Sequence, residues 1–331
     1  MHKLVRATFS AAVVGAVAVV LSACGGSSTG GATATGNDRQ LSIGFVPGIA
    51  SDPFFLAMHI GAQEEAKRLG IKLLWQGSPS EYSPQSQLPY VDAVLTQKVD
   101  GLALVPTDAD ALQPSVIKAQ GQKIPVVTVD TTVADKSYLT SAITGDNELG
   151  GKQAADTLAK QIGGSGEVFL MSGSPTATTN QLREKGFTDA LRKYPDVKLV
   201  GKAYAYSQPA KATSAINIAL LKHRDLKGIF AVDGTTGTGA VAALRNAGKV
   251  GKVKLIGYDA YQEQIADLRA GIFSALIAQR PGDEAAVALR YLVAQIHGED
   301  TGQIRKDVVL PNIVMTRANL DKTIKYAYPA K

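Results

Sequence analysis

The chain has 331 residues, of which 45% are hydrophobic and 19% are charged, with one cysteine and a formal net charge of +6. A single cysteine excludes an internal disulfide, so burial alone must hold the fold together. Lysines and arginines are scattered among acidic neighbours rather than clustered, which argues against nucleic acid as a partner.

The first 39 residues are expected to serve export and attachment rather than the fold. A basic start precedes an apolar run at 11–21 that is too short to span a bilayer, and Leu-Ser-Ala-Cys ends at Cys24. This pattern is similar to a bacterial lipobox; an ordinary signal peptide with an incidental cysteine is the alternative. We expect a lipoprotein signal peptide over 1–23, lipidation of Cys24 and a flexible tether over 24–39. The protein would then be a cell-membrane lipoprotein that faces the periplasm or the outer surface.

From residue 41 onward, short apolar runs of strand length alternate with helical patterns. The expected strands are 41–46, 71–75, 102–105, 125–129, 138–144, 167–171, 197–204, 228–232, 253–257 and 273–277. The expected helices are 54–69, 85–97, 111–121, 148–161, 180–193, 211–222, 240–247, 262–270 and 283–297. The strand runs are continuously apolar, which is typical of parallel strands covered by helices on both faces. The pattern therefore predicts a doubly wound α/β protein.

Two pairs of segments resemble each other within the chain. Residues 99–108 and 226–235 are each a strand, an Asp/Thr-rich loop and an Ala-rich helix start, and 125–130 and 254–259 are each an apolar strand that ends in aspartate. This similarity favours two related lobes over one large sheet.

Polar and aromatic residues follow several of these strands. In open α/β sheets, ligands bind beyond the carboxyl ends of the strands, so the loop at 47–54 is predicted to bind a ligand. Phe54 and Phe55 beside Asp52 suit a sugar, because rings cover its C–H faces and a carboxylate accepts its hydroxyl protons. Three more carboxylates follow strands in the same way, at Asp130, Asp233 and Asp259. Helix capping is the alternative role for each of these acids.

Seven short motifs carry a family resemblance, in the order 45–70, 106–108, 127–130, 183–187, 230–233, 256–259 and 277–279. Together they resemble the ribose-binding type (type I, cluster B) of periplasmic sugar-binding lipoproteins of bacterial ABC transporters, over the whole chain from residue 40. The resemblance implies two Rossmann-like lobes with parallel sheets, joined by a three-strand hinge. The N-terminal lobe would be 40–144 plus 279–308, and the C-terminal lobe 145–278 plus 309–331.

The resemblance also implies a set of ligand contacts: Asp52, Phe54, Phe55, Asp130, Arg183, Tyr206, Asp233, Asp259 and Gln279. Solvation on a helix is the alternative for Arg183, and a backbone bridge in the hinge is the alternative for Gln279. Tyr206 could instead pack against the protein. Trp75, the only tryptophan, is expected to pack in the core, with stacking against the ligand as the second candidate role.

Four positions depart from the ribose-binding pattern. Asp52 and Asp233 stand where that pattern has asparagine, Val105 stands where it has asparagine, and Thr131 stands where it has arginine. More acceptors and fewer donors suit a ligand rich in hydroxyl donors, such as a sugar alcohol or another small sugar. The segment 77–85 looks more like the rhamnose or autoinducer branch, which widens the choice.

The expected function is capture of a small carbohydrate or polyol by hinge closure and its delivery to an ABC permease with its ATPase. A monomer without catalytic residues, cofactor or metal is expected. The alternative is a binding protein that presents a sugar-like signal to a sensor or chemoreceptor. An enzyme is disfavoured because no metal-ligand spacing and no nucleophile or phosphate-binding motif occurs. A transcription regulator is disfavoured because a signal and tether stand where a DNA-binding segment would be needed.

Overall fold

The structure, a computed structural model, describes residues 39–299 and 301–329. The expected signal peptide, the lipidation site at Cys24 and the expected tether up to residue 38 lie outside the described residues. Within the described part of the chain, no helix has both the length and the apolar character needed to cross a membrane.

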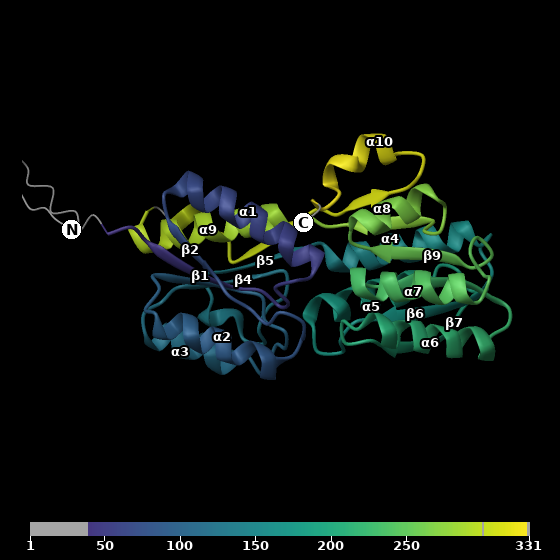
Figure 1. The fold of residues 1–331 in the computed structure, drawn as a ribbon, viewed down its shortest axis with the longest axis horizontal. Coiled ribbons are helices and arrows are strands. Elements are labelled where there is room, and N and C mark those ends of the chain that lie inside the picture. The colour runs from purple at the N-terminus through teal and green to yellow at the C-terminus, as the bar shows by residue number, and fades with distance from the viewer. Residues whose placement is uncertain (1–38, 300, 330–331) are drawn as a thin grey trace, which may run out of the picture. The chain divides into compact units, whose positions relative to one another are not determined.

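The first of two sheets has the strand order β11-β5-β4-β3-β1-β2, and every neighbouring pair is parallel. Its strands are β1 (Ser42–Val46), β2 (Lys72–Trp75), β3 (Gly101–Leu104), β4 (Val126–Val129), β5 (Ser141–Gly145) and β11 (Asp307–Leu310). Helices α1 (Pro53–Leu69) and α9 (Pro281–His297) lie on one face, and α2 (Pro84–Thr96) and α3 (Gln113–Gly121) lie on the other (Figure 1).

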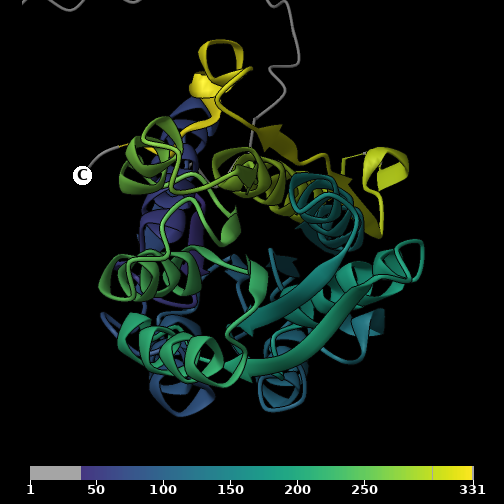
Figure 2. The same cartoon turned by 90° about the vertical axis from the view of Figure 1, so that its right-hand side faces the viewer.

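The second sheet has the order β12-β10-β9-β8-β6-β7, parallel except where β12 runs antiparallel to β10. Its strands are β6 (Gly166–Ser172), β7 (Val197–Tyr204), β8 (Leu226–Ala231), β9 (Lys254–Tyr258), β10 (Ala275–Ala278) and β12 (Ile313–Met315). Strands β6 and β7, in teal, run side by side in Figure 2. Its helices are α4 (Asn147–Gln161), α5 (Thr178–Leu191), α6 (Pro209–Lys222), α7 (Gly234–Asn246) and α8 (Gln262–Arg269), and α10 (Leu320–Thr323) follows β12.

Burial on both faces explains the continuously apolar strands. Strands β3, β4 and β10 are buried at every residue. In the second sheet, alternate strand residues pack with α4 and α5 in one cluster and with α6, α7 and α8 in another. The predicted α/β architecture with two parallel-dominated sheets is confirmed.

Helix α7 begins at Gly234, whereas the sequence predicts a loop there and a helix only from residue 240. The Asp233 side chain accepts a hydrogen bond from the Thr236 backbone N–H (2.8 Å), and the Thr236 hydroxyl accepts one from the Asp233 N–H (3.1 Å). This reciprocal cap starts the helix early. At Gly239 a Cβ would come within 2.4 Å of the Pro209 carbonyl oxygen, so this glycine allows α6 to pack closely on α7.

The C-terminal strands β11 and β12 are not predicted by the sequence, and residues 136–138 form a 3₁₀ turn ahead of β5. The chain passes from one sheet to the other after β5, after β10 and between β11 and β12. The expected lobe boundary between 308 and 309 falls inside β11, because its pairing with β5 continues to Leu310.

Candidate functional site

A cavity of about 60 Å³ lies where the carboxyl ends of strands from both sheets meet. Eight of the nine predicted ligand-contact residues line it, and the ninth, Tyr206, does not. The lining residues are Ile49, Asp52, Phe54, Phe55, Tyr82, Asp130, Thr179, Asn180, Arg183, Ser207, Asp233, Thr235, Asp259, Tyr261 and Gln279.

Asp52 and the two phenyl rings are positioned by the start of α1. The Asp52 side chain accepts a hydrogen bond from the Phe54 backbone N–H (2.8 Å), and Pro53 occupies the first helical position. Phe54 and Phe55 form an edge-to-face pair with ring centroids 5.1 Å apart. Both rings are buried in the cavity wall. Asp52 is therefore a helix cap and a lining residue at once, so the two roles considered for it do not exclude each other.

Asp130 and Asp259 extend into the cavity from the ends of β4 and β9. Both have left-handed backbone conformations, with φ of 62° and 73°. Their backbone N–H groups donate to the next strand, at the carbonyls of Ile143 (2.8 Å) and Ile277 (2.9 Å). Residues other than glycine adopt this backbone conformation at a cost of roughly 1–3 kcal/mol, and such residues cluster at functional sites.

Arg183 is buried, which excludes the solvated role considered for it. Its Nε donates to Asn147 Oδ1 (2.7 Å), Nη1 to the Val232 carbonyl oxygen (2.9 Å) and Nη2 to Gln279 Oε1 (2.8 Å). The guanidinium also lies 3.7 Å from the centroid of the Tyr258 ring. Three of its five N–H groups are thus committed to the protein, and the fork has a fixed orientation at the cavity.

Two glycines bring α4 and α5 close enough to place Arg183. A Cβ on Gly151 would come within 2.1 Å of the Arg183 carbonyl oxygen, and a Cβ on Gly186 would come within 2.0 Å of the Glu148 carbonyl oxygen. Because real Cβ atoms do not approach so closely, a larger residue at either position would separate the helices and shift the guanidinium.

The carboxylates of the second sheet are engaged by the protein. Asp259 accepts hydrogen bonds from the Gly234 N–H (2.8 Å), Gln279 Nε2 (2.7 Å) and Tyr328 Oη (3.0 Å). In addition to capping α7, Asp233 accepts a hydrogen bond from the Thr235 hydroxyl (2.9 Å).

The carboxylates of the first sheet have fewer donors. Oδ1 of Asp130 is buried and has no hydrogen-bond partner in the described part of the chain. Burial raises the pKa of Asp130 to about 7 against the opposing effect of Arg183. Burial likewise raises the pKa of Asp52 to about 7, against the hydrogen bond from Tyr261. Oδ1 of Asp130 is thus an acceptor at the cavity that lacks a donor, which a hydroxyl-rich molecule would supply.

Three tyrosines belong to the site but were not predicted from the sequence. Tyr261 Oη donates to Asp52 at 2.9 and 3.0 Å from its two oxygens, which joins the halves built on the two sheets. Tyr82 lines the first half, and Tyr328 holds Asp259 from the C-terminal segment. Tyr261 follows Asp259 by two residues in the loop after β9, a signal that could have been used. Tyr328 follows no predicted strand and had no such signal.

Tyr206 and Trp75 lie outside the cavity. The backbone turns at Tyr206 (φ 52°) and Ser207 (φ 54°), so that Ser207 lines the cavity while Tyr206 is 47% exposed. Tyr206 is therefore the one predicted ligand contact that the structure does not place at the cavity. Trp75 stacks on His59 with ring centroids 4.3 Å apart and contacts Phe45 at 4.6 Å, which is the packing role favoured for it.

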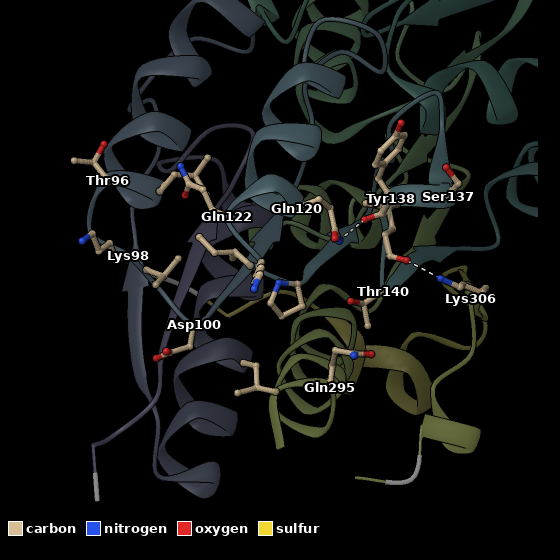
Figure 3. A pocket seen from close by; sticks show the side chains of 17 residues that line it. Thr96, Lys98, Asp100, Gln120, Gln122, Ser137, Tyr138, Thr140, Gln295 and Lys306 are labelled. Atoms are coloured by element: carbon tan, nitrogen blue, oxygen red, sulfur yellow. Dashed lines mark hydrogen bonds between the residues drawn. The ribbon is translucent and has the colours of Figure 1, made fainter. Parts of the chain in front are cut away.

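A much larger hollow, of about 1310 Å³, lies at the opposite ends of the first sheet's strands (Figure 3). It is lined by the segments that precede β3, β4 and β5 and by residues such as Lys98, Gln120 and Lys306. None of the predicted site residues contributes to it. The smaller cavity is the candidate site because the acids, the rings and the guanidinium converge there.

Comparisons with known proteins place the chain in a family and agree with its fold. A family model described as a periplasmic binding protein domain matches residues 43–300. The chain is similar to the ribose import binding protein RbsB of Bacillus subtilis (27% identity over 84% of this chain and 88% of that protein). It is also similar to the xylitol-binding protein of Mycolicibacterium smegmatis (28% identity over 95% of this chain and 87% of that protein). A solved ABC transporter solute-binding protein from Agrobacterium vitis, bound with α-D-tagatopyranose, matches with a TM-score of 0.85 at 28% identity, over 88% of this chain and 100% of that chain.

Proposed function

This chain belongs to the periplasmic binding protein family, and we propose that it captures a small sugar or sugar alcohol and delivers it to the permease and ATPase of an ABC importer. The family is extracytoplasmic, and the relatives above are named as binding proteins. The prediction of a binding protein rather than an enzyme is therefore confirmed.

The observation that carries the proposal is the composition of the cavity wall. Two phenyl rings, Phe54 and Phe55, lie beside four carboxylates and one oriented guanidinium. Rings bury the C–H faces of a carbohydrate, and ionised carboxylates accept its hydroxyl protons. Hydrogen bonds to charged groups contribute roughly 1.5–3 kcal/mol each, so a few of them suffice for tight binding.

The surplus of acceptors favours a polyol or another ligand with many free hydroxyl donors. Asp52 and Asp233 provide carboxylates where the ribose-binding pattern has amides. Asp130 Oδ1 receives no hydrogen bond from any of the described residues. Among the described residues that line the cavity, only Arg183 carries a guanidinium, and it has two N–H groups left after its three hydrogen bonds to the protein. The relative named as xylitol-binding lends this choice support.

Hinge closure is the proposed mechanism of capture. The ligand would contact both halves only when they are together, so it shifts the population toward the closed form. Contacts between the halves support this: besides the Tyr261–Asp52 bond, the Thr132 N–H donates to the Thr178 hydroxyl (3.1 Å). The proposed lobes follow the two sheets, with the third crossing between Leu310 and Ile313.

We also propose that a lipid on Cys24 attaches the protein to the membrane and that it acts as a monomer. The lipobox-like sequence supports the anchor. Mass spectrometry of the exported protein and size measurement in solution test the two points separately.

A thermal-shift panel of pentoses, hexoses, deoxysugars and sugar alcohols tests the proposed function. A ligand that binds only the folded state at a hundredfold excess over its Kd stabilises it by about 2.7 kcal/mol. We expect the largest shift from a sugar alcohol or a small sugar, and the stabilisation should fall to about 1.4 kcal/mol or less in Asp130→Asn, which is expected to bind at least about tenfold more weakly. A panel in which no compound raises the melting temperature would contradict the proposal.

A further inference from the structure

One wall of the ligand cavity comes from the segment 76–83, which joins β2 to α2. Its residue Tyr82 lines the cavity and is half-buried. At Gly48, in the loop after β1, a Cβ would come within 2.6 Å of Tyr82 Cε2 and within 2.9 Å of Phe55 Cζ. The Tyr82 and Phe55 rings therefore both lie against the backbone of Gly48, where no side chain has room. Tyr82 adds a third ring to the wall that Phe54 and Phe55 begin.

Hydrogen bonds hold the segment in place on both sides of Tyr82. Before it, the Ala50 N–H donates to the Ser78 carbonyl oxygen (2.7 Å), which fastens the segment to the loop after β1. After it, the Ser83 hydroxyl accepts from the Ser86 N–H (3.2 Å) and caps α2. The backbone of Tyr82 is thus fixed between a loop of the first sheet and the start of a helix.

The buried side chain of Gln87, near the start of α2, makes this wall rigid. Its Nε2 donates to the carbonyl oxygens of Pro47 (3.1 Å) and Val105 (2.6 Å). Its Oε1 accepts from the backbone N–H and the hydroxyl of Thr107, both at 2.9 Å. One side chain therefore joins α2 to the loops that follow β1 and β3. The backbone that carries Tyr82 cannot move away from the cavity without the loss of these bonds.

The Tyr82 hydroxyl reaches a position where this chain departs from the ribose-binding pattern. It interacts with the side chain of Thr131, the residue that follows Asp130. Thr131 is buried, and its own hydroxyl donates to the Pro106 carbonyl oxygen (2.7 Å). The ribose-binding pattern has arginine at this position, so a long cation is replaced by a short hydroxyl and by an aromatic ring from a different segment. The cavity beside Asp130 thus has a rigid aromatic boundary.

The volume of the cavity limits the ligand. A cavity holds one water molecule in roughly 10–15 Å³, so the volume of about 60 Å³ corresponds to about four to six waters. Each CH–OH unit of a polyol takes up about the space of one water molecule in the liquid, about 30 Å³. Four or five such units therefore fit, whereas a sixth brings the ligand to the limit that the walls set.

We propose that the ring of Tyr82 sets the upper size of the ligand, so that the site accepts five-carbon polyols and sugars and rejects their six-carbon homologues. The inference rests on the proposed function and adds the residue that decides between ligands. The ring acts through its volume, because its hydroxyl is directed at Thr131. One extra carbon in a closely fitted pocket changes binding by about 10–200-fold.

Titration calorimetry of the full chain with matched pairs of compounds tests the proposal, with xylitol against sorbitol and D-ribose against D-allose. We expect the wild type to bind the five-carbon member at least about tenfold more tightly, and Tyr82→Ala to reduce this ratio to about threefold or less by admitting the six-carbon member. Tyr82→Leu, which keeps an apolar side chain against Gly48, serves if Tyr82→Ala does not fold.

Two control variants separate the ring from other effects. Tyr82→Phe keeps the ring and removes the hydroxyl, so it should retain the ratio of the wild type. Tyr138→Ala, in the hollow at the opposite ends of the strands (Figure 3), should retain it as well.

Three results would overturn the proposal and leave the proposed function intact. They are a wild type that binds the six-carbon member of the pairs equally or more tightly, an unchanged ratio in Tyr82→Ala and Tyr82→Leu, and a ratio lost in Tyr82→Phe, which would assign the selectivity to the hydroxyl. If no sugar or polyol binds at all, the proposed function falls and this inference falls with it.

Discussion

Asp130 and Asp259 occupy equivalent places in the two sheets but have different surroundings. Each follows a buried parallel strand, each has a left-handed backbone, and each donates its backbone N–H to the neighbouring strand. Asp259 accepts three hydrogen bonds from the protein, whereas Oδ1 of Asp130 has no partner among the residues that the structure describes. The same scaffold thus carries one engaged and one open carboxylate.

The difference separates positioning from recognition. Asp259 holds Gln279, which in turn accepts from Arg183, so its charge is used to orient other side chains. Asp130 faces the same cavity with an acceptor left over, and a ligand hydroxyl is the donor that it lacks. If this division is correct, removing the charge of Asp259 should lower the stability of the protein, and removing the charge of Asp130 should weaken ligand binding.

Removal of Arg183, the cation that faces both aspartates, should have the largest effect. Arg183→Ala leaves buried carboxylates without their counter-charge and three acceptors without a donor, so we expect a loss of about 3–5 kcal/mol in the free energy of unfolding. Urea unfolding measures it. Arg192→Ala, at the exposed end of the same helix, should change it by less than about 1 kcal/mol. Similar losses in both variants would argue against the network.

Asp259→Asn should cost about 1–3 kcal/mol of stability in the absence of sugar. In the wild type, Asp259 Oδ1 accepts from Gln279 and Tyr328, and Oδ2 accepts from Gly234. The asparagine side chain replaces one of these oxygens with an NH₂ group, so at least one of the three donors loses its acceptor. Chemical denaturation of wild type and variant measures the change. A variant as stable as the wild type would show that Asp259 is not a positioning residue.

The stability of the sugar-free protein should fall as the pH rises from about 4 to about 7. Burial raises the pKa of Asp52 and of Asp130 to about 7 from an ordinary value of 3.8, so folding disfavours their charged forms. Their contribution is complete below about pH 4 and is lost as the pH passes through about 7. Thermal unfolding across this range should show a shallower decline in Asp130→Asn; identical slopes would contradict the assignment.

Ligand binding near pH 7 should release a fraction of a proton. Hydroxyl donors stabilise the ionised carboxylates of Asp52 and Asp130 and so lower pKa values that lie near 7 in the free protein. Calorimetry in two buffers of different ionisation enthalpy measures the release. Proton uptake would indicate that the ligand buries these groups in their neutral form.

Much of this organisation could be predicted from the sequence, because continuous apolar runs and their terminal aspartates mark parallel strands and their carboxyl ends. Asp52, Phe54, Phe55, Asp130, Asp233 and Asp259 line the cavity for that reason, whereas Arg183 and Gln279 were expected there only from the family resemblance. Tyr206 does not line the cavity because the chain turns at 206–207 and places Ser207 there instead, which no local pattern shows. Tyr261 and Tyr328 were missed because tertiary hydrogen bonds give them their places. Glu284 reads as an ordinary first-turn acid, and only packing shows that it is buried.

The most direct measurement is a calorimetric titration of wild type and Asp130→Asn with the ligand that the thermal-shift panel identifies. Asparagine tolerates the left-handed backbone at this position, so the variant changes the charge and little else. We predict that it binds at least about tenfold more weakly, a difference of about 1.4 kcal/mol, while its sugar-free stability equals or exceeds that of the wild type. Asp135→Asn, exposed in the loop that follows, should bind as the wild type does. Equal affinities of wild type and Asp130→Asn would contradict the role of Asp130 as the carboxylate that recognises the ligand.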